Sequence, residues 1–200
     1  PYPSHHMFNE LVIDNLRPGT ILINSARGAI IDNQALLKRL KNKGDLITVI
    51  DAWEHEPAIN LELLKLVTLG TAHIAGYSQV AKIKGTALLH DAFCQFYKLK
   101  KMISPELNQK QSLSSVLLDS KGQAKDQLSC ERTILAAYNI LDDHARMQGL
   151  FNSSNPVSLF DKLRKQYPIR KEFHEFNIDA ENCDDTLRNE LSVLGFQVVQ

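Results

Sequence analysis

The sequence is poor in cysteine, and the cysteines that it has do not cluster. Cys94, Cys130 and Cys183 lie far apart and form no Cys-x-x-Cys pair. Small disulfide-stabilised domains have an even number of cysteines, and zinc sites have ligand pairs at short spacing. We therefore expect no disulfides, no metal ion and a reducing compartment such as the cytoplasm.

The chain also lacks an excess of charge and any long apolar run. Its 23 basic and 23 acidic residues balance, which gives no broad electrostatic reason to bind nucleic acid or an anionic membrane surface. No apolar stretch reaches the roughly 18 residues of a membrane-spanning helix, and residues 1–9 do not resemble a signal peptide. Nucleic acid and membranes are therefore not expected partners, and any anionic ligand must be bound by local groups.

The sequence does not begin with methionine, and a helix-like pattern starts almost at once at Leu11, Val12 and Leu16. We expect that it starts inside a longer protein. With 200 residues, of which 44% are hydrophobic, it is long enough for one large domain or two small ones with their own cores.

Residues 1–98 alternate short β-branched runs with amphipathic helical stretches, which predicts an α/β fold with a parallel sheet. The expected strands are 20–24, 46–50 and 67–69, the first of them apolar enough to be buried on both faces. Asp32 is a predicted helix cap and Gly44 a predicted helix end. Further helices are expected at 61–66 and along a long stretch from 78 to 98.

The pattern changes after Leu99, where polar residues interrupt it, so we predict a domain boundary between 98 and 99. Residues 99–200 are expected to form a small α+β domain. Its predicted elements are a helix from Cys130 to Met147, a loop at 152–156 and a closing strand-helix-strand from about Phe173 to Val199.

Polar residues follow each of the three expected strands, as the blocks 25–28, 51–57 and 71–77. Ligands of open α/β sheets lie beyond the carboxyl ends of the strands, so Arg27, Glu56 and His73 should meet at one edge. A guanidinium can hold a carboxylate with two hydrogen bonds, and an imidazole can take a hydroxyl proton. A glutamate bonded to one ring nitrogen fixes the tautomer of the histidine. These residue types suit the oxidation of an alcohol beside a carboxylate.

Each of these residues also has a simpler interpretation. A single arginine or histidine is more often a surface or packing residue. Glu54, His55 and Glu56 could form a solvated loop or, as a weaker alternative, a metal cluster. Their spacing, however, matches no His-Glu-x-x-His or Cys/His pattern.

The blocks Ile23–Gly28, Asp51–Pro57 and Thr71–Gly76 resemble, in order and spacing, the signature blocks of the D-2-hydroxy-acid dehydrogenase family. The resemblance implies a Rossmann-like, NAD-binding domain, of which residues 1–98 would be the C-terminal part. It implies three catalytic residues, with Arg27 binding the substrate carboxylate, Glu56 orienting the acid–base residue and His73 transferring the proton. One departure is Ala72, where the family usually has proline.

The resemblance also implies which residues contact NAD. They are Ser25, Ala26, Arg27, Asp51 and Gly76. The phosphate-binding Gly-x-Gly-x-x-Gly turn of the family is absent, since the glycines stand singly. We therefore expect that these residues alone bind NAD weakly or not at all and are inactive.

Within the family, one branch acts on a small phosphorylated 2-hydroxy acid. Tyr77 resembles a substrate-binding residue of that branch, and residues 160–165 with Tyr167 resemble part of its C-terminal dimerisation domain. The resemblance implies a homodimer formed through residues 99–200. Two alternatives remain open: a family member acting on 3-phosphoglycerate with a small-molecule regulatory domain, and a non-catalytic dimerisation module.

Overall fold

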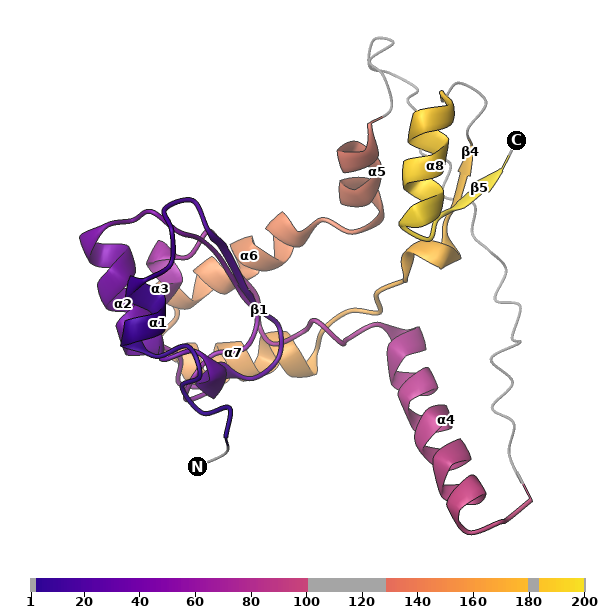
Figure 1. The fold of residues 1–200 in the computed structure, drawn as a ribbon, viewed down its shortest axis with the longest axis horizontal. Coiled ribbons are helices and arrows are strands. Elements are labelled where there is room, and N and C mark those ends of the chain that lie inside the picture. Colours follow the sequence, from indigo (N-terminus) through magenta and orange to yellow (C-terminus); the bar gives the residue numbers. More distant parts are fainter. Residues whose placement is uncertain (1–2, 101–128, 180–183, 200) are drawn as a thin grey trace. The chain divides into compact units, whose positions relative to one another are not determined.

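The computed structural model describes residues 3–100, 129–179 and 184–199 (Figure 1). They group into two compact units. The first joins residues 1–75 to 140–167, and the second joins residues 76–139 to 168–200. Each unit has a parallel sheet of its own, which confirms the predicted α/β class.

The first unit is built on a three-stranded parallel sheet with the order β1-β2-β3. Its strands are β1 (Ile21–Asn24), β2 (Ile47–Ile50) and β3 (Leu69–Gly70). Asn24 is in register with Ile50, and Ile50 with Gly70. All three carboxyl ends therefore lie at one edge of the sheet, as predicted. The third strand is shorter and later than expected, because Val67 is the C-cap of the preceding helix.

Three helices lie together beside this sheet (Figure 1): α1 (Glu10–Asp14), α2 (Asn33–Asn42) and α3 (Leu61–Leu66). A side-chain oxygen of Asn9, Asp32 or Asn60 accepts hydrogen bonds from the first turn of each helix. Such caps satisfy backbone N–H groups that a helix leaves without partners. The predicted capping role of Asp32 is therefore confirmed, and Gly44 does follow α2, with a φ of +59°.

Two later helices complete the first unit: α6 (Ile140–Gln148) and α7 (Pro156–Lys165), joined by the short helix η2 (Gly149–Asn152). The backbone N–H of Gly70 donates to His144 Nδ1 at 3.0 Å, so α6 is bonded directly to β3. The predicted single helix from Cys130 to Met147 is wrong. Helix α5 (Cys130–Ala137) ends at Tyr138, whose backbone is extended, and α6 begins separately.

The second unit contains a parallel pair of strands, β4 (Asn177–Asp179) and β5 (Gln197–Val199), connected through α8 (Asp185–Val193). This confirms the predicted closing strand-helix-strand. Phe176, Ile178, Leu191 and Phe196 form its buried core, against which Ile134 of α5 packs. The short helix η3 (Phe173–Glu175) precedes β4.

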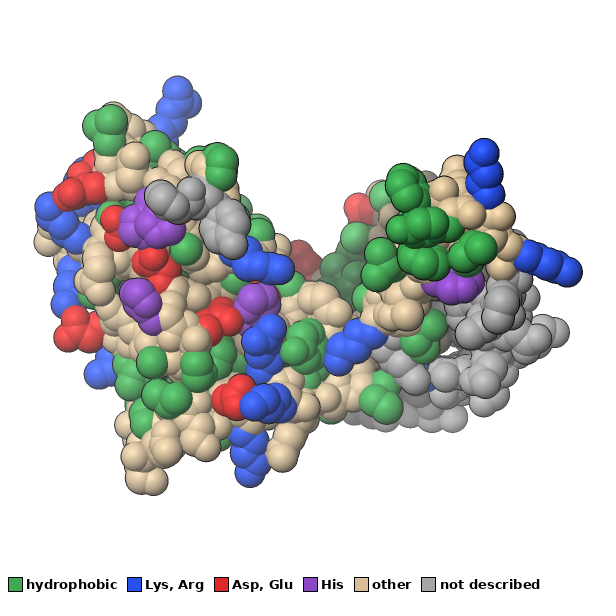
Figure 2. All heavy atoms as spheres, turned by 90° about the horizontal axis from the view of Figure 1, so that it is seen from below, with side chains coloured by type: hydrophobic (Ala, Val, Ile, Leu, Met, Phe, Trp, Pro, Cys, Tyr) green, Lys and Arg blue, Asp and Glu red, His purple; other side chains and the backbone are tan. Residues whose placement is uncertain are grey.

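The long helix α4 (Gln79–Phe96) also belongs to the second unit and confirms the predicted helix in that region. Its apolar side chains are largely exposed: Leu89 is 73% exposed and Phe96 79%. Apolar side chains gather over the end of this helix in Figure 2. None of the helices in the described ranges is both long and apolar enough to cross a membrane.

One face of β1 is exposed. Ile21 and Ile23 of β1 are 61% and 64% exposed, while Leu22 between them is 7% exposed. The prediction that this strand is buried on both faces is therefore wrong for the described residues. Alternate residues of a strand point to opposite faces, so one face of β1 is buried and the other is exposed.

Candidate active site

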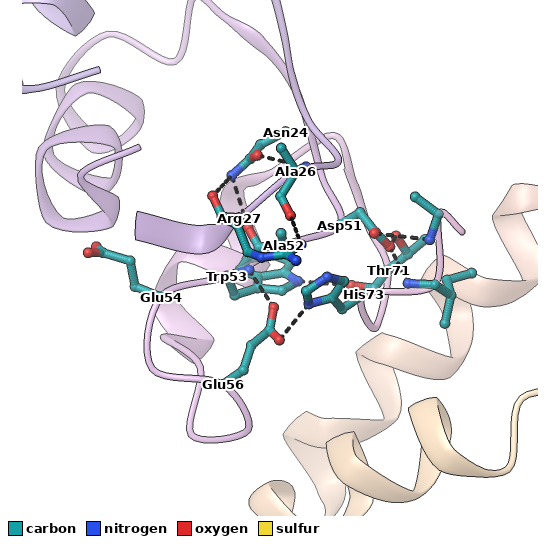
Figure 3. A network of polar contacts seen from close by, with 12 residues as sticks. Asn24, Ala26, Arg27, Asp51, Ala52, Trp53, Glu54, Glu56, Thr71 and His73 are labelled. Atoms are coloured by element: carbon teal, nitrogen blue, oxygen red, sulfur yellow. Dashed lines mark hydrogen bonds and ion pairs between the residues drawn. The ribbon is translucent and has the colours of Figure 1, made fainter. Parts of the chain in front are cut away.

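Three loops leave the carboxyl ends of β1, β2 and β3 and meet at the same edge of the sheet (Figure 3). The predicted residues Arg27, Glu56 and His73 come from these three loops, one from each. Figure 3 shows the guanidinium of Arg27 beside the imidazole of His73, with Glu56 next to both. The structure thus brings together the three residues predicted to be catalytic.

The closest contact in this group joins His73 and Glu56. The Nδ1 atom of His73 lies 2.7 Å from Oε2 of Glu56, and both side chains are about four-fifths buried. The backbone of His73 has a φ of +55°, a left-handed conformation that is uncommon for a residue other than glycine. Such conformations persist where the surrounding structure enforces them, and they are enriched at functional sites.

Trp53 fixes Glu56 in place. The backbone N–H of Trp53 donates to Oε1 of Glu56 at 2.7 Å, so each carboxylate oxygen of Glu56 has its own partner. The indole N–H of Trp53 donates to the carbonyl oxygen of Thr71 at 2.8 Å, and the ring is only 2% exposed. This side chain therefore links the loop that carries Glu56 to the loop that carries His73.

The buried carboxylate of Asp51 organises the loop around His73. Its Oδ1 accepts from the hydroxyl of Thr71 at 2.6 Å and from the backbone N–H of Ile74 at 2.7 Å, and its Oδ2 accepts from the N–H of Ala75 at 3.1 Å. A carboxylate can accept several such bonds, and buried acceptors need them. Asp51 was expected to contact the nicotinamide end of NAD, and that role stays a prediction.

Asn24 organises the loop after β1 through its side-chain hydrogen bonds, as Asp51 does for the loop around His73. It is 4% exposed, and its side-chain amide donates to the carbonyl oxygens of Arg27 and Ala52 and accepts from the N–H of Ala26. The loop therefore holds its shape while Ser25, Ala26 and Arg27 stay exposed at the edge of the sheet. Neither Asn24 nor Trp53 was predicted as a site residue. The available signal for Asn24 was a polar residue ending an apolar strand.

Gly28 lets the first and second loops approach each other. A Cβ atom added to this residue would lie 1.9 Å from the backbone oxygen of Trp53, far inside any van der Waals contact. Only glycine fits here. The close approach of backbone to backbone sets the position of Arg27 relative to the loop that carries Glu56.

Gly76 and Tyr77 begin the second unit. A Cβ atom at Gly76 would meet no described atom within 4 Å, and the ammonium of Lys82 lies 4.1 Å from the centre of the Tyr77 ring. The predicted contacts of Gly76 with NAD and of Tyr77 with substrate therefore stay predictions.

This arrangement can transfer a proton and bind a carboxylate. An ionised carboxylate only accepts hydrogen bonds, so Nδ1 of His73 carries the hydrogen and donates it to Glu56. The other ring nitrogen, Nε2, then has a lone pair that can take a proton from a hydroxyl group. The exposed guanidinium of Arg27 offers the paired donors that match a carboxylate.

Comparison with known proteins gives a family match for the first part of the chain. Residues 3–75 match the family model described as D-isomer specific 2-hydroxyacid dehydrogenase, NAD binding domain. Residues 110–195 match a domain family of unknown function. The match of residues 3–75 covers the loops that carry Arg27, Glu56 and His73.

Curated relatives match the whole chain. The erythronate-4-phosphate dehydrogenase of Cellvibrio japonicus is 39% identical over 99% of this chain and 53% of its own length. The erythronate-4-phosphate dehydrogenase of Saccharophagus degradans is 39% identical over 100% of this chain and 52% of its own length. The one of Klebsiella pneumoniae is 36% identical over 100% of this chain and 51% of its own length. The chain spans about half the length of these relatives and matches their C-terminal half.

A solved structure, the apo D-mandelate dehydrogenase of Rhodotorula graminis, is 28% identical over 48% of this chain and 28% of its own, with a TM-score of 0.43.

Proposed function

We propose that this chain supplies the proton-transfer half of an NAD-dependent oxidation, because residues 3–75 match the family model described as D-isomer specific 2-hydroxyacid dehydrogenase, NAD binding domain. The proposed substrate is 4-phospho-D-erythronate and the proposed product 2-oxo-3-hydroxy-4-phosphobutanoate, because the relatives that match the whole chain are named erythronate-4-phosphate dehydrogenases. One observation carries the proposal: the 2.7 Å contact between His73 and Glu56 at the carboxyl ends of the strands, beside Arg27.

In this proposal the substrate carboxylate binds to the guanidinium of Arg27 through two hydrogen bonds. The 2-hydroxyl group then faces Nε2 of His73, which accepts its proton as the carbonyl bond forms. Glu56 accepts a hydrogen bond from Nδ1 throughout, which holds the tautomer and stabilises the positive charge that His73 gains. Positioned proton transfer of this kind contributes about 10² to 10⁴ in rate.

Bound NAD would supply the acceptor for the hydride that leaves C2 of the substrate. The residues at the sheet edge fit its nicotinamide end, since the loop after β1 exposes the small side chains of Ser25 and Ala26 next to Arg27. The 200 residues contain no Gly-x-Gly-x-x-Gly turn, which in this class of domain binds the pyrophosphate. We therefore infer that these residues alone bind NAD weakly and do not turn over substrate.

Three finer assignments belong to the same proposal. Gly76 and Tyr77 contact NAD and substrate respectively, residues 99–200 form the interface of a homodimer, and the protein works in the cytoplasm. The division at residues 98 and 99 stays part of the same proposal. The family matches cover residues 3–75 and 110–195, and the compact units divide the chain elsewhere.

The proposal can be tested with a chimera in which the unmatched first half of the Cellvibrio japonicus relative precedes residues 3–200. We expect NAD-dependent turnover of 4-phospho-D-erythronate by the chimera and none by the 200-residue chain. In the chimera, His73→Ala should lower kcat by roughly 10²- to 10⁴-fold. His174→Ala, which changes an exposed histidine of the second unit, is the matched control and should leave kcat unchanged.

Other outcomes would replace the proposal. Turnover of 3-phosphoglycerate instead of 4-phospho-D-erythronate would identify a different member of the family. An inactive chimera that still dimerises, with a His73→Ala variant indistinguishable from it, would favour a non-catalytic dimerisation module. Turnover by the isolated 200-residue chain would contradict the inference that these residues alone bind NAD weakly and are inactive.

A further inference from the structure

A second group of side chains in the first unit has no part in the proposed proton transfer. His5, His6 and Glu54 each offer one nitrogen or oxygen atom, and these atoms lie within 4.8 Å of one another. Nε2 of His6 is 2.6 Å from Oε1 of Glu54, and the rings of His5 and His6 stack with centroids 4.0 Å apart. Two imidazoles and one carboxylate therefore lie near enough to one another to share an ion after small side-chain movements.

A turn presents the two histidines. The backbone N–H of Met7 donates to the carbonyl oxygen of Ser4, and that of His6 donates to the carbonyl oxygen of Ala29 at 2.7 Å. His6 has a φ of +49°, an uncommon backbone conformation for a β-substituted residue. The backbone hydrogen bonds and the left-handed residue fix the turn, so the two adjacent side chains point to the same place.

The carboxylate of Glu54 is held so that one oxygen faces His6. Its Oε2 accepts the backbone N–H of Asn33 at 2.8 Å, at the start of α2, while Oε1 faces His6. A second carboxylate, that of Asp32, lies 3.7 Å from the far ring nitrogen of His6. Metal-binding histidines commonly have a carboxylate beside the nitrogen that does not bind the metal, and metal-binding carboxylates are themselves hydrogen-bonded.

We propose that His5, His6 and Glu54 bind a divalent transition-metal ion of the Zn²⁺ type. Two histidines and one glutamate form a recognised three-residue zinc set, with a fourth position left for water or another ligand. The nitrogen ligands disfavour Mg²⁺ and Ca²⁺, which prefer oxygen. The contact between His6 and Glu54 must widen to roughly 3.3 Å to admit the ion between them. His5 is exposed, so its ring is free to close on the ion.

The site lies at the side of a pocket of 680 Å³. His5 and Glu54 line this pocket together with Arg27 and Gly28. A bound ion would therefore join the segment at residues 4–7 to the loop after β2, next to the arginine that is proposed to hold the substrate carboxylate. The metal site stands independently of the proposed reaction, because it rests on the geometry of its own three residues.

The test is a titration of the 200-residue chain after treatment with a chelator. Zn²⁺ binding is measured by calorimetry and Co²⁺ binding by the visible absorption of a tetrahedral nitrogen-oxygen site. We expect one ion per chain with micromolar or tighter affinity, and no heat with Mg²⁺. His5→Ala should weaken binding at least tenfold without changing the melting temperature of the metal-free chain, because this side chain is exposed.

Glu54→Gln should weaken Zn²⁺ binding at least as much, and His174→Ala, the matched control, should leave it unchanged. Glu54→Gln also alters a hydrogen bond at the start of α2, so a variant that fails to fold is set aside and His5→Ala decides. Millimolar affinity, or equal affinity in the wild type and His5→Ala, would overturn the proposal and leave the contact between His6 and Glu54 as a purely structural bond.

Discussion

In the first sheet, the edge at the carboxyl ends of the strands differs from the exposed face of β1, here called the flat side. They differ in how far their side chains find partners within the described residues. At the edge, the buried polar groups of Asp51, Asn24 and Trp53 have hydrogen-bond partners that come from the loops themselves. On the flat side, Ile21 and Ile23 are more than 60% exposed. The buried polar groups therefore have their hydrogen-bond partners within the described residues, whereas the apolar side chains on the flat side are exposed to water.

The positions of the catalytic candidates and the coverage of the sheet therefore depend on different parts of the molecule. The hydrogen bonds that hold Glu56 and the loop of His73 come from neighbouring loops of the first unit, so their partners lie within the described residues. Apolar surface is stabilising only when it is removed from water. Contiguous exposed apolar patches in folded proteins commonly mark interaction surfaces, and the open side of β1 and the exposed side chains of α4 are of this kind.

The largest effect on stability is expected from Gly28→Ala, which disrupts the close approach between the backbones of the first and second loops. The added methyl group would lie 1.9 Å from the backbone oxygen of Trp53, and that oxygen cannot move without displacing the loop of Glu56. We expect a loss of about 3 kcal/mol or more in unfolding free energy, measured by urea denaturation. Gly76→Ala is the control, because a Cβ there meets nothing within 4 Å. Equal stability of the two variants would contradict the described close approach.

Asp51→Asn should have the next largest effect. The carboxylate accepts hydrogen bonds from two backbone N–H groups and one hydroxyl, whereas an amide has one acceptor oxygen and directs an NH₂ group at a donor. Leaving a buried N–H without a partner costs about 1 to 3 kcal/mol. We expect a loss of about 2 to 4 kcal/mol in the same measurement. A change below about 0.5 kcal/mol, which is typical of surface substitutions, would show that the loop of His73 does not depend on this carboxylate.

The open side of the sheet is expected to respond weakly. Replacing Ile21 and Ile23 together by threonine should change the unfolding free energy by less than about 0.5 kcal/mol each, because both side chains are exposed. Leu22→Ala, on the covered face of the same strand, should cost about 2 to 4 kcal/mol. Comparable losses from the two faces would mean that the isoleucines are buried in the folded chain, and the contrast between edge and flat side would then be lost.

Much of the site followed from one rule about parallel sheets. Once the strands ending at Asn24, Ile50 and Gly70 are recognised, the residues just after them must share an edge. The contact between Glu56 and His73 is a direct consequence. The helix caps were readable for a similar reason, because Asp32 acts on backbone groups only two and three residues away.

Features that depend on distant residues could not be predicted in the same way. His6 and Glu54 are 48 positions apart, and their contact depends on a turn with an unusual φ that the residue types do not reveal. The break between α5 and α6 at Tyr138 also lacks a proline or glycine to mark it. The exposure of Ile21 depends on which elements pack on the sheet, and the residue types of the strand alone do not reveal those elements.

The last prediction concerns a polar network away from the edge. The guanidinium of Arg39 is almost completely buried and donates to both carboxylate oxygens of Asp45 at 2.9 Å. The hydrogen bond from Arg39 lowers the pKa of Asp45 below its usual value of 3.8. Asp45 therefore contributes stability that is fully present above this value and is lost as the pH falls through the lower pKa of the folded state.

Thermal melting between pH 5 and pH 2 checks this contribution. Asp45→Asn should melt at a lower temperature than the wild type at pH 5, and the difference should shrink as the solution is acidified. Glu62→Gln removes a carboxylate paired with the half-exposed Lys41, so its effect should disappear in 1 M salt while that of Asp45→Asn largely persists. A constant difference across the pH range would mean that Asp45 acts through packing, and the link between buried Arg39 and acid stability would fail.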